Sequence, residues 1–344
     1  MTMDIANELC AHGYEVTVMA TKHHAEAYPV GTQRRFNVVE LPHGNVKYSP
    51  RVARFVRDYI REHAVRAFVS YRELLYASWL KRQTGAAYIF ALQSMPFYEM
   101  SHASWIARHF YLNKYRRILR TADAYGVLCE GNRRRLISTL GLADESAKIY
   151  VLPNSIVPKQ NRVLEKRKEA IFVGRLSRRD KRVDRLLRIW AEAEVQLPDW
   201  TLRIIGDGPE RRALQELASE LHLQHVRFEG FQTDVQPYYD TASVLCLTSS
   251  FEGWPLVVAE AQANGVVPIV FNSFDSASEI ISSSDEGVLV PPFDEHAFAQ
   301  DLISLSHNTE RLERMSKVVV AKASSYSIAR TFEAWQNILR RVVS

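Results

Sequence analysis

Short runs of consecutive apolar residues recur along the chain and alternate with segments of helical periodicity. Residues 124–128 and 170–173 are such runs, which indicate strands buried on both faces of a parallel sheet. Residues 73–83 and 130–140 instead place their apolar side chains at helical spacing. Strands that alternate with helices of this length predict an α/β fold with doubly wound parallel sheets.

The α/β pattern is interrupted once, near the middle of the chain. Residues 156–168 carry several charges and include Pro158, which together favour a linker. The chain has 344 residues, enough for two α/β domains of ordinary size. The predicted parts are an N-terminal domain over 1–155, this linker, a C-terminal domain over 169–326 and a last helix over about 327–344.

A loop in the second half carries two carboxylates near a helix start. Glu252 follows the apolar run 243–248, and Glu260 lies early in a helix predicted from Pro255 to Gly265. A first-turn proline is tolerated because its missing N–H would have had no partner there. The remaining free N–H groups and the helix dipole suit a phosphate. Because carboxylates repel phosphate, the two Glu side chains are expected to bind hydroxyl groups of a sugar or ribose.

The spacing of Glu252 and Glu260, with Gly253-Trp254-Pro255 between them, resembles the signature of glycosyltransferase family 4. Members of that family are retaining, nucleotide-sugar-dependent enzymes with the two-domain GT-B fold. The resemblance implies that Glu252 binds a hydroxyl of the transferred sugar and that Glu260 binds the ribose. It places Gly253, Trp254, Pro255 and Leu256 against the donor. Taken alone, the pair also fits a helix cap and a solvated helix residue.

A second segment combines a strand, two cations and a helix. The strand 170–173 runs into Gly174 and Arg175, and Lys181 precedes a helix over 183–195. Cations beside free helix N–H groups form a phosphate cradle, although a solvated basic loop is the alternative. By the family resemblance, Arg175 and Lys181 bind the donor diphosphate, with Gly174 in the same loop.

The strand that ends at Phe231 leads into a loop where the family commonly places the base of the nucleotide. In the first half, residues 89–96 resemble the segment in which members often carry a histidine near the reacting sugar. This chain has Gln93 there, which we assign to the acceptor side. Glutamine can bond a sugar hydroxyl but cannot act as a general base at neutral pH.

The start of the chain departs from the family pattern. Residues 2–12 and 14–20 resemble the first helix and second strand of the N-terminal domain. The first strand and its glycine-rich loop are expected before that helix and are absent from this sequence. Either the chain begins late, or the gene start is wrong, or the protein is a natural shortened variant. The predicted fold is therefore two Rossmann-like domains, the first without its expected first strand.

Charge is distributed unevenly along the chain. Residues 1–158 contain 21 Lys and Arg against 13 Asp and Glu, whereas the rest contains 23 against 26. Residues 104–120 form a basic helix that includes Trp105, Ile106 and Phe110. Aromatic and cationic side chains on one helix predict a membrane-surface contact, whereas packing on the protein's own sheet is the alternative. No motif favours nucleic acid as a partner.

Composition favours a cytoplasmic protein. The three cysteines are scattered, which argues for a reducing compartment and against a zinc site or disulfides. No apolar stretch approaches the ~18 residues of a membrane span, and the acidic residues near the start argue against a signal peptide. The sequence therefore predicts no metal and no cofactor, with peripheral contact to the inner face of the plasma membrane through the basic helix.

The family resemblance implies a hexosyltransferase-type glycosyltransferase that uses a nucleoside diphosphate sugar, with UDP favoured ahead of GDP. The acceptor is expected to be a glycan or a lipid-linked glycan of bacterial cell-surface polysaccharide, lipopolysaccharide or capsule. The site is expected in the cleft between the domains, at the carboxyl ends of the strands. A non-catalytic nucleotide-sugar-binding protein, or a GT-B epimerase or phosphorylase, is the alternative.

Overall fold

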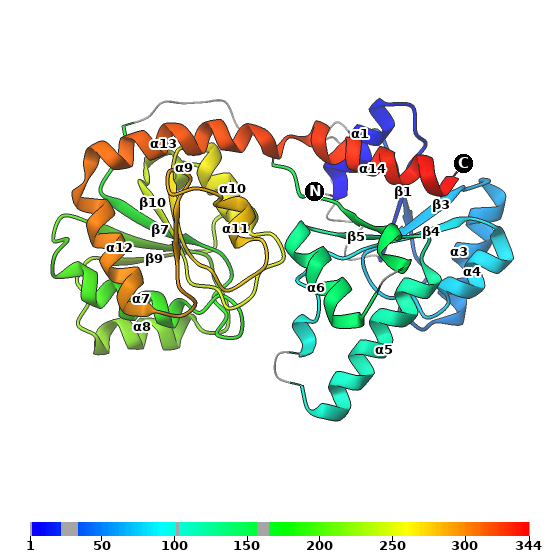
Figure 1. Cartoon of the computed structure of the whole chain (residues 1–344), viewed down its shortest axis with the longest axis horizontal. Helices are drawn as coiled ribbons and strands as arrows, with labels where there is room; N and C mark the ends of the chain where they lie inside the picture. Colours follow the sequence, from blue (N-terminus) through cyan, green and yellow to red (C-terminus); the bar gives the residue numbers. More distant parts are fainter. Residues whose placement is uncertain (1, 22–33, 101–102, 143, 157–164, 344) are drawn as a thin grey trace. The chain divides into compact units, whose positions relative to one another are not determined.

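The computed structural model describes residues 2–21, 34–100, 103–142, 144–156 and 165–343 (Figure 1). The chain divides into two compact units, Met1–Ser155 with Ile328–Ser344, and Ile156–Ser327. Most of the predicted linker, residues 157–164, falls outside the described residues. Both units consist of parallel strands with intervening helices, so the predicted α/β class is confirmed.

The second unit contains a parallel sheet with the strand order β12-β11-β10-β7-β8-β9. This order follows the two-halved, doubly wound pattern, in which the chain proceeds outwards from β7 and then returns to add β10 on its other side. The carboxyl ends of β7 and β10 therefore meet at the topological switch point of the sheet. The strands are β7 (Glu169–Val173), β8 (Thr201–Ile205), β9 (Val226–Gly230), β10 (Val244–Leu247), β11 (Val267–Phe271) and β12 (Val288–Val290).

Helices cover both faces of this sheet, with α7 and α8 on one side and α9 and α10 on the other (Figure 1). Apolar side chains fill the layers between, and Phe172, Trp190 and Phe271 are fully buried. The helices are α7 (Val183–Glu194), α8 (Arg211–Glu220), α9 (Gln236–Thr241), α10 (Leu256–Ala263), α11 (Ala277–Ile280), α12 (Glu295–His307) and α13 (Thr309–Ala323), followed by the 3₁₀ turn η3 (Ser324–Tyr326).

The first unit contains two parallel sheets among its described residues. One pairs β1 (Thr17–Ala20) with β2 (Asn37–Glu40). The other has the order β3-β4-β5-β6 and consists of β3 (Ala67–Ser70), β4 (Ala87–Ala91), β5 (Ala124–Val127) and β6 (Ile149–Val151). The surrounding helices are α1 (Thr2–Ala11), α3 (Pro50–Glu62), α4 (Ala77–Thr84), α5 (Trp105–Thr121), α6 (Glu130–Leu140) and α14 (Ile328–Val343), with the 3₁₀ turns η1 (Tyr98–Met100) and η2 (Asp144–Lys148).

The last helix, α14, belongs to the first unit although it follows the second unit in sequence. It lies beside α1 (Figure 1) and buries Trp335 and Ile338 in one cluster with Ile5 and Ile89. The Thr331 hydroxyl also donates to the Pro153 carbonyl at 3.0 Å. Apolar contacts thus attach both ends of the chain to the sheet of the first unit.

The helix predicted over 73–83 starts later than expected. It is α4, which begins at Ala77, because Glu73 is buried in an ion cluster instead of occupying the first turn. Lys47 Nζ lies 2.8 Å from Glu73, and Arg117 also pairs with this carboxylate. Burial alone would raise the pKa of Glu73, but hydrogen bonds from the two cations outweigh it and lower the pKa below its usual value.

Candidate donor-binding site

The loops that follow β7 and β10 meet at the switch point of the second unit. The backbone N–H of Ser250 donates to the Asp180 carbonyl at 2.7 Å. The Thr248 hydroxyl donates to the carbonyl of Arg182 at 3.0 Å and lies 3.3 Å from that of Lys181. These bonds join the two segments that the sequence predicted as parts of one site, although about 70 residues separate them.

The loop after β7 is also packed against the loop after β8. Leu176 N–H donates to the Asp207 carbonyl at 2.9 Å, and Gly174 N–H donates to the Ile205 carbonyl at 2.9 Å. Gly206 has φ +137°, and a Cβ placed there would lie 1.9 Å from the Gly174 carbonyl oxygen. Only glycine permits this approach. The Gly-Asp-Gly-Pro turn therefore supports the loop that carries Arg175 and Lys181.

Lys181 and Glu252 form the centre of the site. Lys181 Nζ lies 2.6 Å from Glu252 Oε1, and the Ser249 hydroxyl donates to the same oxygen at 2.7 Å. The two charged side chains are 18% and 12% exposed. Both donors occupy Oε1, so Oε2 has no protein partner among the residues that the structure describes. The carboxylate is held on one side and offers its second oxygen as an acceptor.

The backbone directly after Lys181 is in the left-handed conformation. The next residue, Arg182, has φ +50° and ψ +48° and precedes the first turn of α7. Its guanidinium donates through two nitrogens to Asp184, each at 2.9 Å. Burial acts to raise the pKa of Asp184, but the bonds from Arg182 and Arg188 outweigh it and lower the pKa. The ionised, bidentate pair stabilises a backbone conformation that is otherwise unfavourable for arginine.

Glu260 is fixed by a different element. It lies in α10, and its Oε2 accepts the hydroxyl of Tyr239 from α9 at 3.0 Å. The predicted helix is present, but Pro255 stands just before α10 as its N-cap rather than in the first turn. Gly265 follows the helix with φ +70°, as expected for its end. No side chain of the described residues caps the start of α10, which leaves N–H groups for an anion.

Three predicted residues lie away from these contacts. Arg175 is exposed and makes no hydrogen bond or ion pair with the described part of the protein. Phe231, beyond the end of β9, is 72% exposed. Gln93 is exposed after β4 in the other unit. All three side chains are exposed, and their proposed contacts with donor or acceptor remain predictions.

Trp254 and Leu256 direct their side chains into an apolar cluster with Ile156, Ala323 and Tyr326. The Trp254 and Tyr326 rings meet edge to face, with centroids 5.8 Å apart. The indole nitrogen of Trp254 is buried and has no hydrogen-bond partner within the described residues. These side chains anchor the loop, so their predicted contact with a donor depends on backbone groups, together with those of Gly253.

Two residues of the site were missed by the sequence reasoning. Ser249 comes directly after the buried run 243–248, so its place at the carboxyl edge could have marked it. Tyr239 gave no such signal, because the sequence does not show which face of a six-residue helix will pack against α10.

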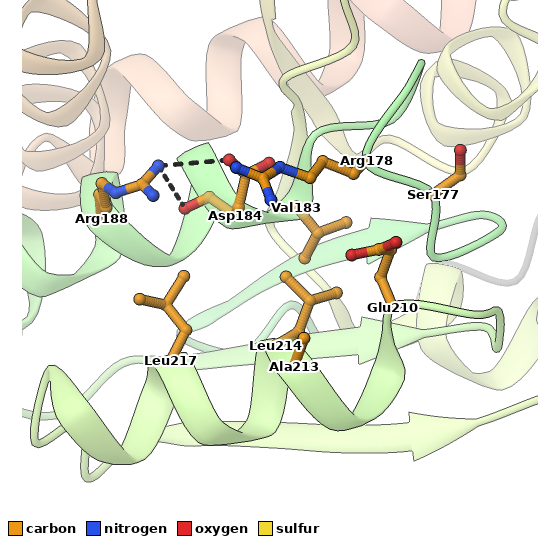
Figure 2. A pocket seen from close by; sticks show the side chains of 9 residues that line it. All are labelled: Ser177, Arg178, Val183, Asp184, Arg188, Glu210, Ala213, Leu214 and Leu217. Carbon is orange, nitrogen blue, oxygen red and sulfur yellow. Dashed lines mark hydrogen bonds and ion pairs between the residues drawn. The ribbon is translucent and has the colours of Figure 1, made fainter.

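A separate pocket of about 130 Å³ lies between α7 and α8. Figure 2 shows Ala213, Leu214 and Leu217 of α8 on one side, and Asp184 with Arg188 of α7 on the other. None of the predicted site residues lines this pocket. Ser177, Arg178 and Glu210 complete its lining, so the pocket borders the loop that carries Arg175 and Lys181.

Within the described residues, no group of three or more His, Cys, Asp or Glu side chains is placed to hold a metal ion. No helix in the same part of the chain is both long enough and apolar enough to cross a membrane.

Strand order and site position define the second unit as a doubly wound, Rossmann-like α/β domain. Residues 154–319 match the family described as glycosyl transferases group 1, and residues 1–155 match the glycosyl transferase 4-like domain. The chain therefore belongs to the family 4-like glycosyltransferases of the GT-B fold, which confirms the resemblance seen in the motifs.

Several relatives are bacterial glycosyltransferases. The chain is 26% identical over 352 residues to an uncharacterised glycosyltransferase of Haemophilus influenzae, covering 98% of this chain and 95% of the relative. It is 30% identical over 182 residues to the amylovoran biosynthesis glycosyltransferase AmsD of Erwinia amylovora (53% and 48%). It is 29% identical over 210 residues to lipopolysaccharide 1,6-galactosyltransferase of Escherichia coli (57% and 56%). The chain thus spans only about half of the last two relatives.

Solved structures of other proteins share this fold. The Anabaena protein HepE, crystallised in complex with UDP, superimposes with a TM-score of 0.80 at 16% identity, covering 98% of this chain and 94% of HepE. The likeness confirms two Rossmann-like domains of the GT-B type.

Proposed function

We propose that this glycosyltransferase moves a sugar from a nucleoside diphosphate sugar, UDP-linked ahead of GDP-linked, with retention at the anomeric carbon. The observation that carries the proposal is the Lys181–Glu252 pair at the switch point, in which one carboxylate oxygen is left for a substrate hydroxyl. The UDP complex of HepE supports the choice of base.

The chemistry of the leaving group explains the cations. As the glycosidic bond breaks, negative charge grows on the diphosphate. Preorganised donors aimed at that charge lower the barrier, and removal of one such donor commonly costs about 10²- to 10³-fold in rate. Arg175, Lys181 and the uncapped N–H groups at the start of α10 would supply them. We propose that these groups stabilise the leaving diphosphate without a metal.

The two carboxylates bind the uncharged parts of the donor. Glu252 would accept a hydroxyl of the transferred sugar through its free Oε2, while Glu260 would accept a ribose hydroxyl. Phe231 stands after β9, where the base would lie. In the first unit, the exposed amide of Gln93 would contact the acceptor.

The acceptor is proposed to be a glycan or lipid-linked glycan of the bacterial cell surface. Relatives named for amylovoran and lipopolysaccharide synthesis support this choice. A cytoplasmic enzyme that modifies a lipid-linked acceptor must work at the membrane surface.

Helix α5 provides a surface suited to such contact. Trp105, Ile106 and Phe110 are 78%, 74% and 62% exposed, whereas Ile118 and Leu119 near the other end of the helix are buried. The N-terminal half extends beyond the sheet of its own unit (Figure 1). No acidic residue occurs in α5, which carries several cations. We propose that this end contacts an anionic bilayer as a peripheral element.

The proposal is tested with purified protein and a panel of UDP- and GDP-sugars. Release of nucleoside diphosphate and calorimetric binding are measured for wild type, Glu260→Ala and Arg175→Ala. Turnover of one donor that both substitutions abolish supports the proposal. Binding without turnover, with and without crude glycolipid acceptor, favours a non-catalytic binding protein. Absence of any binding of nucleotide sugars or nucleoside diphosphates overturns the assignment of the site.

A further inference from the structure

Tyr239 is a buried hydroxyl aimed at a site residue. Its side chain is 2% exposed in α9, and its hydroxyl donates to Glu260 Oε2 at 3.0 Å. Burial, reinforced by the neighbouring Glu260 charge, raises the pKa of Tyr239 well above its usual value. The hydroxyl therefore keeps its proton and remains a donor at neutral pH.

The two helices that carry this pair are joined at their ends. Lys166 Nζ donates to the carbonyl of Tyr239 at 2.8 Å and to that of Asn264, just after α10, at 2.7 Å. The Asn264 side-chain amide donates to the Glu260 carbonyl at 2.8 Å. One ammonium thus ties the last turn of α9 to the end of α10. The distance between the Tyr239 hydroxyl and the Glu260 carboxylate is set by this network as well as by packing.

We propose that Tyr239 is a positioning residue for donor binding: it occupies Oε2 of Glu260 and so turns Oε1 toward a ribose hydroxyl of the nucleotide. This inference rests on the proposed function, because it assigns Glu260 to the ribose. The physical gain is preorganisation. A glutamate side chain that is already fixed loses less conformational freedom when the ligand binds, and the hydroxyl meets an oriented acceptor.

The first experiment compares Tyr239→Phe with Tyr238→Phe. Tyr238 is the neighbouring tyrosine of α9, and its hydroxyl lies 3.4 Å from Glu229 rather than near Glu260. Dissociation constants for UDP and for 2′-deoxy- and 3′-deoxy-UDP are measured by calorimetry. Wild type and Tyr238→Phe should prefer UDP to at least one deoxy analogue. Tyr239→Phe should weaken UDP binding by about fivefold to thirtyfold and lose most of that preference.

A double-mutant cycle with Glu260→Ala separates positioning from general loosening. If Tyr239 acts through Glu260, adding Tyr239→Phe to Glu260→Ala should change UDP binding less than twofold. Equal effects of Tyr239→Phe in both backgrounds overturn the inference, as does unchanged discrimination of UDP from both analogues in Tyr239→Phe. If Tyr239→Phe does not fold, Lys166→Met tests the same arrangement, because it keeps the hydroxyl but frees α9. It should also reduce the preference for UDP, and an unchanged preference overturns the inference.

Failure of the proposed function gives a different result. Wild type would then bind neither UDP nor GDP, nor a sugar linked to either, and substitutions of Tyr239 would make no difference. If wild type binds UDP and discriminates against a deoxy analogue while Tyr239→Phe behaves identically, only the role of Tyr239 is wrong.

Discussion

Lys181 and Glu252 are 71 residues apart in the chain, yet their side chains form an ion pair of 2.6 Å at the switch point of the second sheet. Glu252→Gln keeps the shape of the side chain but removes its charge. It should lower kcat by about 10²-fold or more, since the amide orients neither Lys181 nor a sugar hydroxyl in the same way. Steady-state kinetics with the preferred donor check this, and near-normal turnover would contradict it.

Lys181→Met should also reduce stability. The pair is mostly buried, so removing the ammonium leaves Glu252 with only the Ser249 hydroxyl as a donor among the described residues. Loss of one partner of such a pair costs about 1–3 kcal/mol in the free energy of unfolding. Urea denaturation of Lys181→Met, Glu252→Gln and the double variant measures the coupling. Strict additivity of the two single effects would show that the pair contributes nothing as a pair.

Arg175→Ala should separate activity from stability. The guanidinium is exposed and makes no bond with the described protein, so the free energy of unfolding should change by less than about 0.5 kcal/mol. If it stabilises the leaving diphosphate, kcat/KM should still fall by about 10²-fold. Arg178→Ala, three residues further along the same loop, serves as the control and should keep wild-type kinetics. Equal kinetic effects of the two variants would indicate general electrostatics rather than a specific contact.

Gly206→Ala should disrupt the support of the loop. The added Cβ would lie 1.9 Å from the Gly174 carbonyl oxygen, so the backbone must move. We expect a loss of at least about 3 kcal/mol in the free energy of unfolding. Gly141→Ala is the matched control, because φ is +66° there but no atom of the described residues lies within 4 Å of the new Cβ. It should cost about 1 kcal/mol from backbone strain alone. Equal losses in thermal or urea melts would argue against the close approach.

Lys166 should make the free energy of unfolding depend on pH. Burial lowers the pKa of its ammonium to about 8, against 10.5 for a free lysine. Between these values the unfolded chain binds the proton more fully than the folded one, so this group makes stability rise with pH over that window. Relative to Lys166→Met, the free energy of unfolding of wild type should rise by up to about 3 kcal/mol between pH 8 and about pH 10. If urea melts at several pH values give a constant difference in free energy of unfolding between wild type and Lys166→Met, the lowered pKa of Lys166 is contradicted.

The exposed end of α5 predicts membrane binding. Wild type should sediment with vesicles that contain phosphatidylglycerol more than with phosphatidylcholine vesicles, and added salt should weaken the association. Replacing Trp105, Ile106 and Phe110 together by serine should abolish it, since their apolar area drives insertion. Val195→Ser, an 83% exposed apolar site in the other unit, is the control. Binding that persists in the triple variant would refute α5 as the contact.

Much of the fold was predictable from local patterns. The strand over 170–173 and the helix over 130–140 follow from local apolar patterns, and the structure has β7 at Glu169–Val173 and α6 at Glu130–Leu140. The start of α4 was predicted wrongly because apolar spacing does not show that Glu73 is buried in an ion cluster before the helix. Its partners, Lys47 and Arg117, come from distant segments, so only their contacts show that it is buried.

The candidate site was also predictable only in part. Motif spacing marked Glu252, Glu260 and Lys181 as site residues. The loops that follow parallel strands lie at one edge of the sheet, so these residues were expected to lie close together. It could not show that Lys181 and Ser249 share one oxygen of Glu252, since that depends on the side-chain directions of two loops.

The sequence by itself determined the α/β class, the two halves of the chain and the positions of the charged loops, because periodicity and turn chemistry are local properties. The tertiary structure alone decided which charges pair, that Trp254 packs on Tyr326, and that Tyr239 reaches Glu260. These relationships arise when separate segments of the chain pack against one sheet, and their geometry depends on all the side chains between them.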